Sequence, residues 1–141
     1  MNKNISIAIH GGAGTIDPGL MSPEMEKQYV GGLEEALSLG YAALAQGKSA
    51  LDAVEMATCC LENNPLFNAG KGSVFNALGK HEMDASIMDG SNLEAGAVAL
   101  IKNIKNPISF ARKIMEQTEH VFLAGEGAME LANEWKIKME E

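Results

Sequence analysis

The chain has 141 residues, enough for one domain with a single hydrophobic core. Its composition, 46% hydrophobic and 21% charged, is that of an ordinary globular protein. The net charge of −8, from 11 basic and 19 acidic residues, argues against a surface for nucleic acid or an anionic membrane. The first residues show neither a signal sequence nor a membrane-spanning apolar run, so we expect a cytoplasmic protein.

The N-terminal segment predicts a short strand followed by a glycine turn. Ile5, Ile7 and Ile9 alternate with smaller or polar residues, which gives a strand one strongly apolar face. The run Gly11–Gly14 then ends the strand.

Two helices are predicted next. Ser22 followed by Pro23 is typical of an N-cap and a first helical position, and Gly47 closes this helix. Ser49, with Asp52 three residues on, begins the second helix as a variant of the capping box. Proline at position 65 stops it. The expected buried stripes are Tyr29, Leu33, Ala36, Leu37, Gly40 and Leu44 in the first helix, and Ala50, Val54, Ala57 and Leu61 in the second.

The stretch from Asn64 to Asn76 fits neither a helix nor a strand. Pro65 removes one backbone donor, and Gly70 and Gly72 permit backbone angles that other residues avoid. A buried irregular loop must satisfy its carbonyl groups with side chains, water or a cation, and such a loop is usually kept for a site. Four side chains are too apolar to be left in water, so we expect this loop to pack onto a core: Leu66, Phe67, Val74 and Phe75.

The rest of the chain predicts a hairpin, then a helix, a strand and a helix. The expected elements are a strand around 83–87, a turn at 89–92, a strand at 96–101, a helix from 106, a strand at 119–123 and a helix at 125–136. The second strand of the hairpin is almost continuously apolar, which suits burial on both faces.

This order of elements is typical of an α/β or α+β domain that contains an antiparallel pair. The four predicted strands are few for two layers of helices. We therefore expect a partner chain to complete the sheet.

The strand that runs through His10 into Gly11–Gly14 admits three interpretations. Bare amides could hold a phosphate, but neither GxGxxG nor GxxxxGK[ST] is present and no helix follows at once. The amides could instead form an oxyanion hole, as His-Gly-Gly turns do in some hydrolases. The third interpretation is a tight turn under a packed helix.

Two further groups of residues offer little chemistry. His81, Glu82 and Asp84 superficially resemble a metal cluster, but on a strand His81 points away from the two carboxylates. The adjacent pair Cys59-Cys60 lies within a predicted helix, where a disulfide between neighbours would strain the backbone. We expect two buried thiols in a reducing compartment.

The sequence shows no recognisable catalytic nucleophile. No GxSxG elbow occurs, and no cysteine has an electropositive setting. None of the threonines begins the chain, where a free α-amino group could serve as base for its own hydroxyl: Thr15, Thr58 and Thr118. Taken alone, these residues do not identify a catalytic site.

Several motifs, in order, resemble those of the plant-type L-asparaginases, also described as isoaspartyl aminopeptidases. They cover essentially the whole chain, and the Pro-Leu-Phe-Asn-Ala-Gly segment is the most specific of them. The matching segments are 10–14, 64–72, 88–90, 95–98, 106–112 and 125–128.

The resemblance implies an N-terminal-nucleophile hydrolase whose precursor cuts itself before an internal threonine. This chain is similar to the α subunit of such an enzyme, and the β subunit would begin with the nucleophilic threonine. The family fold is a four-layer αββα sandwich, assembled as a dimer of αβ units, (αβ)2. The implied substrates are L-asparagine and β-aspartyl (isoaspartyl) dipeptides.

The resemblance also implies roles for single residues. Asn68 matches the asparagine that holds the amino group of the nucleophilic threonine, a task that suits an amide because it accepts and donates without titrating. Gly11 matches a loop glycine implicated in self-cleavage. A structural sodium ion would be held by backbone carbonyls of Leu61, Glu62, Asn64, Phe67, Ala69 and Lys71.

Two alternatives stay open. One is a small-molecule or phosphate-binding domain that uses the glycine turn, against which the negative charge and the missing P-loop lysine weigh. The other is a glycosylasparaginase-like hydrolase, which fits these motifs less well.

Overall fold

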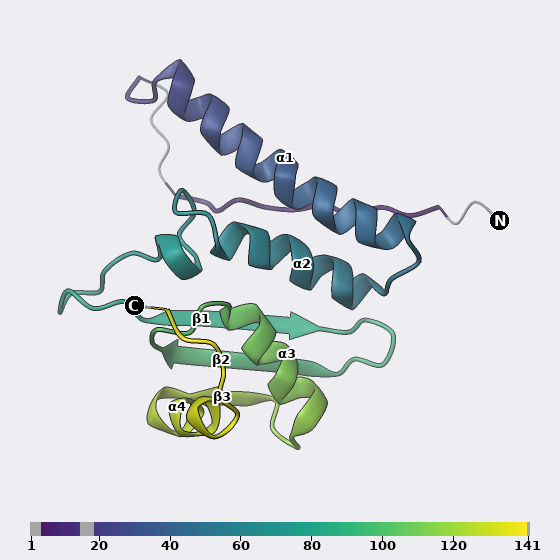
Figure 1. Ribbon diagram of the computed structural model, residues 1–141, viewed down its shortest axis with the longest axis vertical. Coiled ribbons are helices and arrows are strands. Elements are labelled where there is room, and N and C mark those ends of the chain that lie inside the picture. The colour runs from purple at the N-terminus through teal and green to yellow at the C-terminus, as the bar shows by residue number, and fades with distance from the viewer. Residues whose placement is uncertain (1–3, 15–18, 141) are drawn as a thin grey trace.

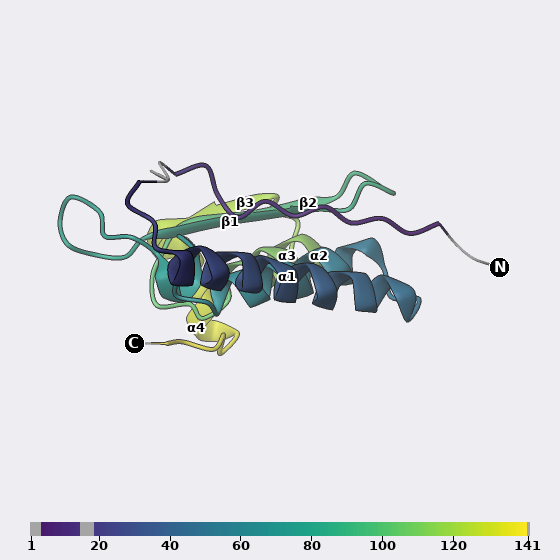
Figure 2. The same ribbon diagram turned by 90° about the horizontal axis from the view of Figure 1, so that it is seen from above.

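The computed structural model describes residues 4–14 and 19–140, with four helices on the same side of a small sheet (Figures 1 and 2). The domain is thus a mixed α/β structure with two layers. Its elements are α1 (Pro23–Ala45), α2 (Ala50–Glu62), the 3-10 turn η1 (Gly70–Gly72), β1 (Met83–Met88), β2 (Ala95–Ile101), α3 (Pro107–Gln117), β3 (Phe122–Ala124) and α4 (Gly125–Glu134). α3 and α4 cover the sheet, and α1 and α2 lie beyond the edge formed by β1 (Figure 1).

The sheet of the described residues has three strands in the order β1-β2-β3. β1 and β2 form the predicted antiparallel hairpin, with Ala85 opposite Val98 and an irregular register between Met83 and Ala85. β3 pairs with β2 in parallel, and Leu123 lies opposite Val98. α3 is the crossover between these two parallel strands, as parallel neighbours require.

The N-terminal segment does not form the predicted β-strand, because it makes no hydrogen-bonded ladder with a described strand. Residues 4–10 are extended, and Ile5, Ile7 and Ile9 are half-buried while their neighbours are exposed, as the alternation predicts. However, no described strand pairs with this segment, and a strand needs a neighbouring backbone to form a ladder. The segment lies against α1 instead, where a Cβ added to Gly40 would come within 2.5 Å of the Cδ1 atom of Ile7.

The caps of the first two helices are confirmed. The Ser22 hydroxyl accepts a hydrogen bond of 3.2 Å from the Met25 N–H. At the start of α2, the Ser49 hydroxyl accepts from the Asp52 N–H (3.0 Å) and the Asp52 carboxylate accepts from the Ser49 N–H (3.2 Å). The sequence therefore located both helix starts through side chains that satisfy free backbone amides.

The predicted buried stripes of α1 and α2 are only partly right. The fully buried positions of α1 are all small, namely Gly32, Ala36, Gly40 and Ala43. Leu37 is 38% exposed, and Val54 of α2 is exposed as well. Small residues let the helices approach closely, since a Cβ on Gly40 would lie 3.1 Å from the Ala53 carbonyl oxygen of α2.

The main core lies between α3, α4 and the sheet. Phe110 and Ile114 of α3 are fully buried together with Ile101 of β2. Gly96 allows the closest approach, because a Cβ there would lie 2.7 Å from the Cβ of Met115. A larger residue at position 96 would push α3 off the strand.

The opposite face of the sheet is not covered by the described residues, as Figure 2 shows. The pairings of Ser86 with Ala97, Met88 with Ala95, and Ala97 with Phe122 place these side chains together on that face. Leu100, at an irregular position of β2 with φ 56°, is 53% exposed. Within the described residues, β2 is therefore fully buried on one face only.

Candidate functional site

The buried side chain of Phe67 packs the loop that follows α2 against α1. Its side chain is 5% exposed, and its ring meets that of Tyr29 edge to face with centroids 5.8 Å apart. A Cβ added to Gly32 of α1 would lie 2.9 Å from Cε2 of Phe67. The absence of a side chain at Gly32 thus makes room for the ring.

The glycine turn meets the same ring. A Cβ on Gly11 would lie 3.2 Å from Cε1 of Phe67 and 2.8 Å from Cδ2 of Leu33. The N–H of Gly12 is already used, because it donates to Nδ1 of His10 at 3.0 Å. The structure therefore brings Gly11 beside the 64–72 loop, while residues 12–14 of the turn are exposed.

Only part of the expected apolar packing of this loop is present. Phe67 is buried and Leu66 is half-buried, but Val74 and Phe75 are exposed. The Phe75 ring instead stacks on His81, with centroids 4.2 Å apart. The predicted burial of Val74 and Phe75 is therefore wrong in this chain.

Asn68 lies at the surface next to the buried Phe67. Its Oδ1 atom accepts a hydrogen bond of 3.0 Å from the N–H of Val74, which ties the two arms of the loop together. A side-chain amide bears two donor hydrogens on Nδ2 and a second lone pair on Oδ1. Asn68 can therefore hold a further polar group at the surface.

The loop also crowds backbone carbonyl groups together. Gly70 has φ 52°, and a Cβ there would lie 2.5 Å from the Glu62 carbonyl oxygen. A Cβ on Gly72 would overlap the carbonyl oxygens of Phe67 and, at 2.7 Å, Pro65. Side chains are thus excluded where main-chain oxygens converge.

Several carbonyl groups predicted for a cation already accept hydrogen bonds. Those of Leu61, Asn64 and Phe67 accept from backbone N–H groups at 3.1, 3.3 and 2.8 Å, and that of Ala69 accepts from Gly72 at 3.1 Å. A carbonyl oxygen has a second lone pair, so these bonds leave it able to bind a cation. Among the described residues, no cluster of His, Cys, Asp and Glu side chains is suited to a metal ion.

Glu62, the last residue of α2, is a charged side chain in the core, only 3% exposed. Oε1 accepts from the Ile108 N–H at 2.8 Å and Oε2 accepts from Nδ2 of Asn106 at 3.0 Å. Burial raises the pKa of Glu62 to about 7, although both hydrogen bonds act in the opposite direction. Glu62 thus caps α3, whereas Asn106, at the N-cap position, makes no capping hydrogen bond with its own side chain.

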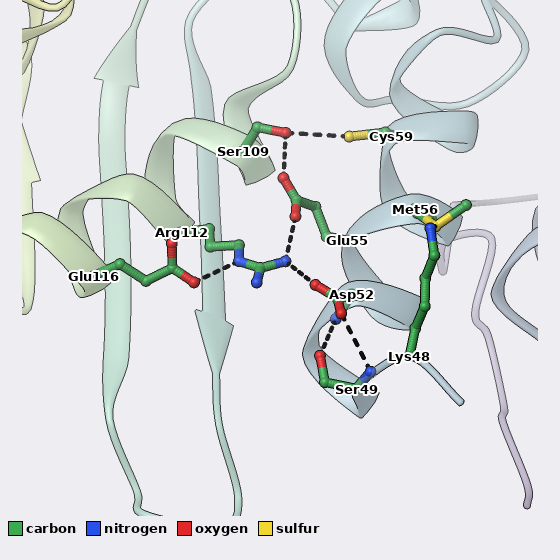
Figure 3. Close-up of polar contacts among 9 residues, drawn as sticks. All are labelled: Lys48, Ser49, Asp52, Glu55, Met56, Cys59, Ser109, Arg112 and Glu116. Carbon is green, nitrogen blue, oxygen red and sulfur yellow. Dashed lines mark hydrogen bonds and ion pairs between the residues drawn. The ribbon is translucent and has the colours of Figure 1, made fainter. Parts of the chain in front are cut away.

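A second polar network joins α2 to α3 around Arg112 (Figure 3). Its Nη1 atom lies 2.7 Å from Oδ1 of Asp52 and 2.6 Å from Oε2 of Glu55, and its Nε atom lies 2.7 Å from Oε1 of Glu116. The hydrogen bonds with Ser49 and Arg112 lower the pKa of Asp52 to about 2. One guanidinium group therefore holds three carboxylates.

The two cysteines are free and partly buried, not fully buried as expected. Burial raises the pKa of the Cys59 thiol to about 11, and the Sγ atom lies 3.4 Å from the Ser109 hydroxyl oxygen. Burial also raises the pKa of Cys60. Both thiols therefore stay protonated near neutral pH and are poor nucleophiles.

A profile of the asparaginase family matches residues 3–141. This chain belongs to the asparaginase family. It is 55% identical to the plant-type L-asparaginase of Pyrococcus horikoshii over 128 residues, which are 91% of this chain and 40% of that protein.

Other relatives are named as isoaspartyl peptidases, with or without L-asparaginase in the name. Over 132 residues the chain is 48% identical to the isoaspartyl peptidase of Salmonella typhimurium, covering 94% of this chain and 42% of that protein. Over 122 residues it is 52% identical to the isoaspartyl peptidase/L-asparaginase of Xenopus laevis, covering 86% and 38%. The chain thus spans about two-fifths of the length of these relatives.

The Glu62 cap and the Arg112 network escaped the sequence analysis. The only sign of this role in the sequence is that Glu62 is an acidic residue at the C-terminal end of a helix, where the helix dipole disfavours a negative charge. Its partners, Asn106 before α3 and Ile108 in its first turn, are more than 40 positions away. In this member of the asparaginase family, such long-range pairs define how the loop-bearing helix sits on the rest of the chain.

Proposed function

We propose that this chain is the α subunit of an amidohydrolase that hydrolyses L-asparagine to L-aspartate and ammonia and cleaves β-aspartyl dipeptides. The observation that carries the proposal is the family match over residues 3–141, together with relatives named for both activities. The nucleophile would be the N-terminal threonine of a β subunit from the same precursor. The covered length, about two-fifths of the relatives, is consistent with such a division.

The uncovered sheet supports a partner chain. Its outer face carries Ala95, Ala97 and Phe122 beside Ser86 and Met88, a mostly apolar set that suits a second sheet packed face to face. Segment 4–10 and the outer edge of β1 have no ladder partner among the described residues. Strands of the β subunit would pair with these edges and complete a four-layer αββα sandwich, with two αβ units forming (αβ)2.

Asn68 and Gly11 would serve the β subunit from this side. Asn68 lies at the surface and has hydrogen-bonding capacity left for the amino group of the threonine. Gly11 packs on the ring of Phe67, the residue before Asn68, so the glycine turn supports the position of this asparagine. The threonine hydroxyl would attack the β-carbonyl, release ammonia or an amino acid, and leave an acyl-enzyme for water to hydrolyse.

The 61–71 loop fits a structural sodium ion. Hard cations prefer oxygen ligands, and this loop brings carbonyl oxygens together beside Gly70 and Gly72. The ion would hold the loop in shape and take no part in the chemistry. The proposed ligands are the carbonyl groups of Leu61, Glu62, Asn64, Phe67, Ala69 and Lys71.

The test is to express the complete precursor and analyse it by denaturing intact-mass spectrometry and N-terminal sequencing. The proposal expects a second chain that begins with threonine, and ammonia release from asparagine and β-aspartyl dipeptides. A precursor that stays uncleaved, or a cleaved protein with no activity on either substrate, would contradict it. Replacing sodium by N-methylglucamine at equal ionic strength should lower the melting temperature if the loop holds the ion.

A further inference from the structure

Four lysines converge on one cavity of about 220 Å3 beside the start of α3. They come from three separate parts of the chain: the loop before α3, α3 itself and the C-terminal segment. They are Lys105, Lys113, Lys136 and Lys138. The remaining lining residues in the part of the chain that the structure describes, Asn106, Ser109, Phe110 and Ile137, include no carboxylate.

Backbone pairing explains how these lysines come together. The C-terminal segment folds back from α4, and the Lys105 N–H donates to the Lys138 carbonyl oxygen at 3.0 Å. An isolated antiparallel bridge between Ile104 and Met139 continues the contact. Lys136 has φ 51°, a left-handed turn that follows the end of α4.

The charge of this cavity opposes that of the chain. The whole chain has a net charge of −8, yet four of the eight described residues that line this cavity are lysines. Among the described residues only Lys105 of the four has a carboxylate partner, Glu140, at 3.3 Å. Like charges held close together repel, so an anion bound between them would stabilise this arrangement.

The nearby carboxylates are engaged elsewhere. Glu55 accepts from the Ser109 hydroxyl at 2.6 Å and pairs with Arg112, while Glu62 accepts from Asn106 and caps α3. The polar groups of Ser109 and Asn106 therefore already donate to carboxylates. Binding in the cavity must come from the ammonium groups, which act as point charges for oxyanions.

We propose that this cavity binds a small phosphate-type polyanion such as inorganic phosphate or pyrophosphate. Its volume is several times the ~30 Å3 share of one water, so a group of several heavy atoms has room. The bound anion would bridge the C-terminal segment and α3. Asn106 joins this cavity to Glu62 through one hydrogen bond, but the anion binding does not depend on the amidohydrolase activity.

The test is calorimetric titration of pyrophosphate into the full-length protein at low salt, with ³¹P line broadening as a second readout. We expect saturable binding that Lys136→Gln/Lys138→Gln weakens by about tenfold or more, since two of the four positive charges that attract the anion are removed. Both lysines are exposed, so the change should leave the fold intact, which a melting curve checks.

Two control variants make the result decisive. Lys27→Gln/Lys80→Gln removes two exposed charges elsewhere and should change the affinity by less than about twofold. Lys136→Arg/Lys138→Arg keeps the charge and should retain binding. The proposal is overturned if pyrophosphate shows no saturable binding at millimolar concentration, or if both glutamine pairs weaken it equally.

Discussion

The carboxylate of Glu62, at the end of α2, accepts a 2.8 Å hydrogen bond from the backbone N–H of Ile108 in the first turn of α3. An acid at this position interacts favourably with the positive end of the α3 dipole and satisfies a free amide. The next residues of the chain form the 64–72 loop. The Glu62 cap therefore fixes the start of that loop relative to α3.

Replacing Glu62 by alanine should destabilise the protein by about 2–3 kcal/mol, because it leaves a buried amide unsatisfied and opens a small cavity. Glu62→Gln keeps an acceptor for the Ile108 N–H and should cost less. Urea unfolding at pH 5 measures both changes. Equal loss in the two variants would contradict the capping role.

The raised pKa of Glu62 predicts a pH dependence of stability. A carboxyl group whose pKa is raised from 4.5 to about 7 on folding stabilises the fold when it is protonated, below pH 4.5. This stability is lost as the pH rises towards 7, by about 3 kcal/mol. The difference in unfolding free energy between wild type and Glu62→Gln should shrink or reverse over this interval, and a constant difference would contradict the prediction.

Gly31 and Gly32 are neighbours on α1, and replacing each by alanine should change the stability in opposite directions. A Cβ on Gly32 would lie 2.7 Å from Nδ2 of Asn64 and 2.9 Å from Phe67, whereas one on Gly31 meets nothing within 4 Å. Gly32→Ala should therefore destabilise the protein by about 1–3 kcal/mol and displace the loop. Gly31→Ala should stabilise it by up to about 1 kcal/mol, since alanine favours helix. Melting temperatures that move in the same direction would contradict this reasoning.

Arg112→Met should lower stability by about 1–2 kcal/mol, because three carboxylates lose their shared partner at a half-buried position. Arg112→Lys should recover only part of the loss, since an ammonium group lacks the fork that spans Asp52 and Glu116. The pKa of Asp52 should rise in Arg112→Met, yet stay below its usual value because Ser49 remains. A carboxyl NMR titration checks this shift.

The lowered pKa of Asp52 acts in the opposite direction to that of Glu62. Its stabilising effect is present above pH 4 and is lost as the pH falls towards 2. Arg112→Met should therefore show a weaker loss of stability in that acid range than wild type.

Asn68→Ala should abolish most of the proposed activity, about a hundredfold or more in kcat, while costing at most about 1 kcal/mol of stability. Asn92→Ala is the matched control, because Asn92 also accepts one backbone hydrogen bond, from the Glu94 N–H at 2.9 Å. That residue lies in the exposed hairpin turn, so its loss should leave ammonia release unchanged. Equal activity in both variants would remove Asn68 from the site.

Cys59 should react slowly with iodoacetamide at pH 8 in the folded protein. With a pKa of about 11, its thiolate fraction is on the order of a hundredfold smaller than that of a free thiol. Mass spectrometry should show little alkylation until urea unfolds the chain. Fast labelling of the folded protein would contradict the raised pKa.

The sequence was informative where structure depends on close neighbours in the chain. The cap at Ser22, the capping box of Ser49 and Asp52, and the β1–β2 hairpin were all predicted within a residue or two. β3 and α4 were also found, with ends shifted by one to three residues. The Pro-Leu-Phe-Asn-Ala-Gly segment also indicated the asparaginase family, and the family match over residues 3–141 confirmed it.

The predictions failed where they depended on contacts between distant segments. The prediction for α1 was right for Ala36 and Gly40, but the leucines of the stripe are not fully buried. Gly32 and Ala43 are buried instead, because the helix meets α2 and Phe67 at close range. Segment 5–9 has the strand pattern, yet no described residue forms a strand paired with it, since pairing needs a neighbour that periodicity does not supply.

The sequence by itself determined the helix caps, the turns and the chemical character of the 64–72 loop, because these depend on residues a few positions apart. Only the tertiary structure decided that Gly11 lies on Phe67, that Glu62 caps α3 and that four lysines share one cavity. These relationships join residues tens of positions apart. Their geometry follows from how the helices pack on the sheet, which no local pattern encodes.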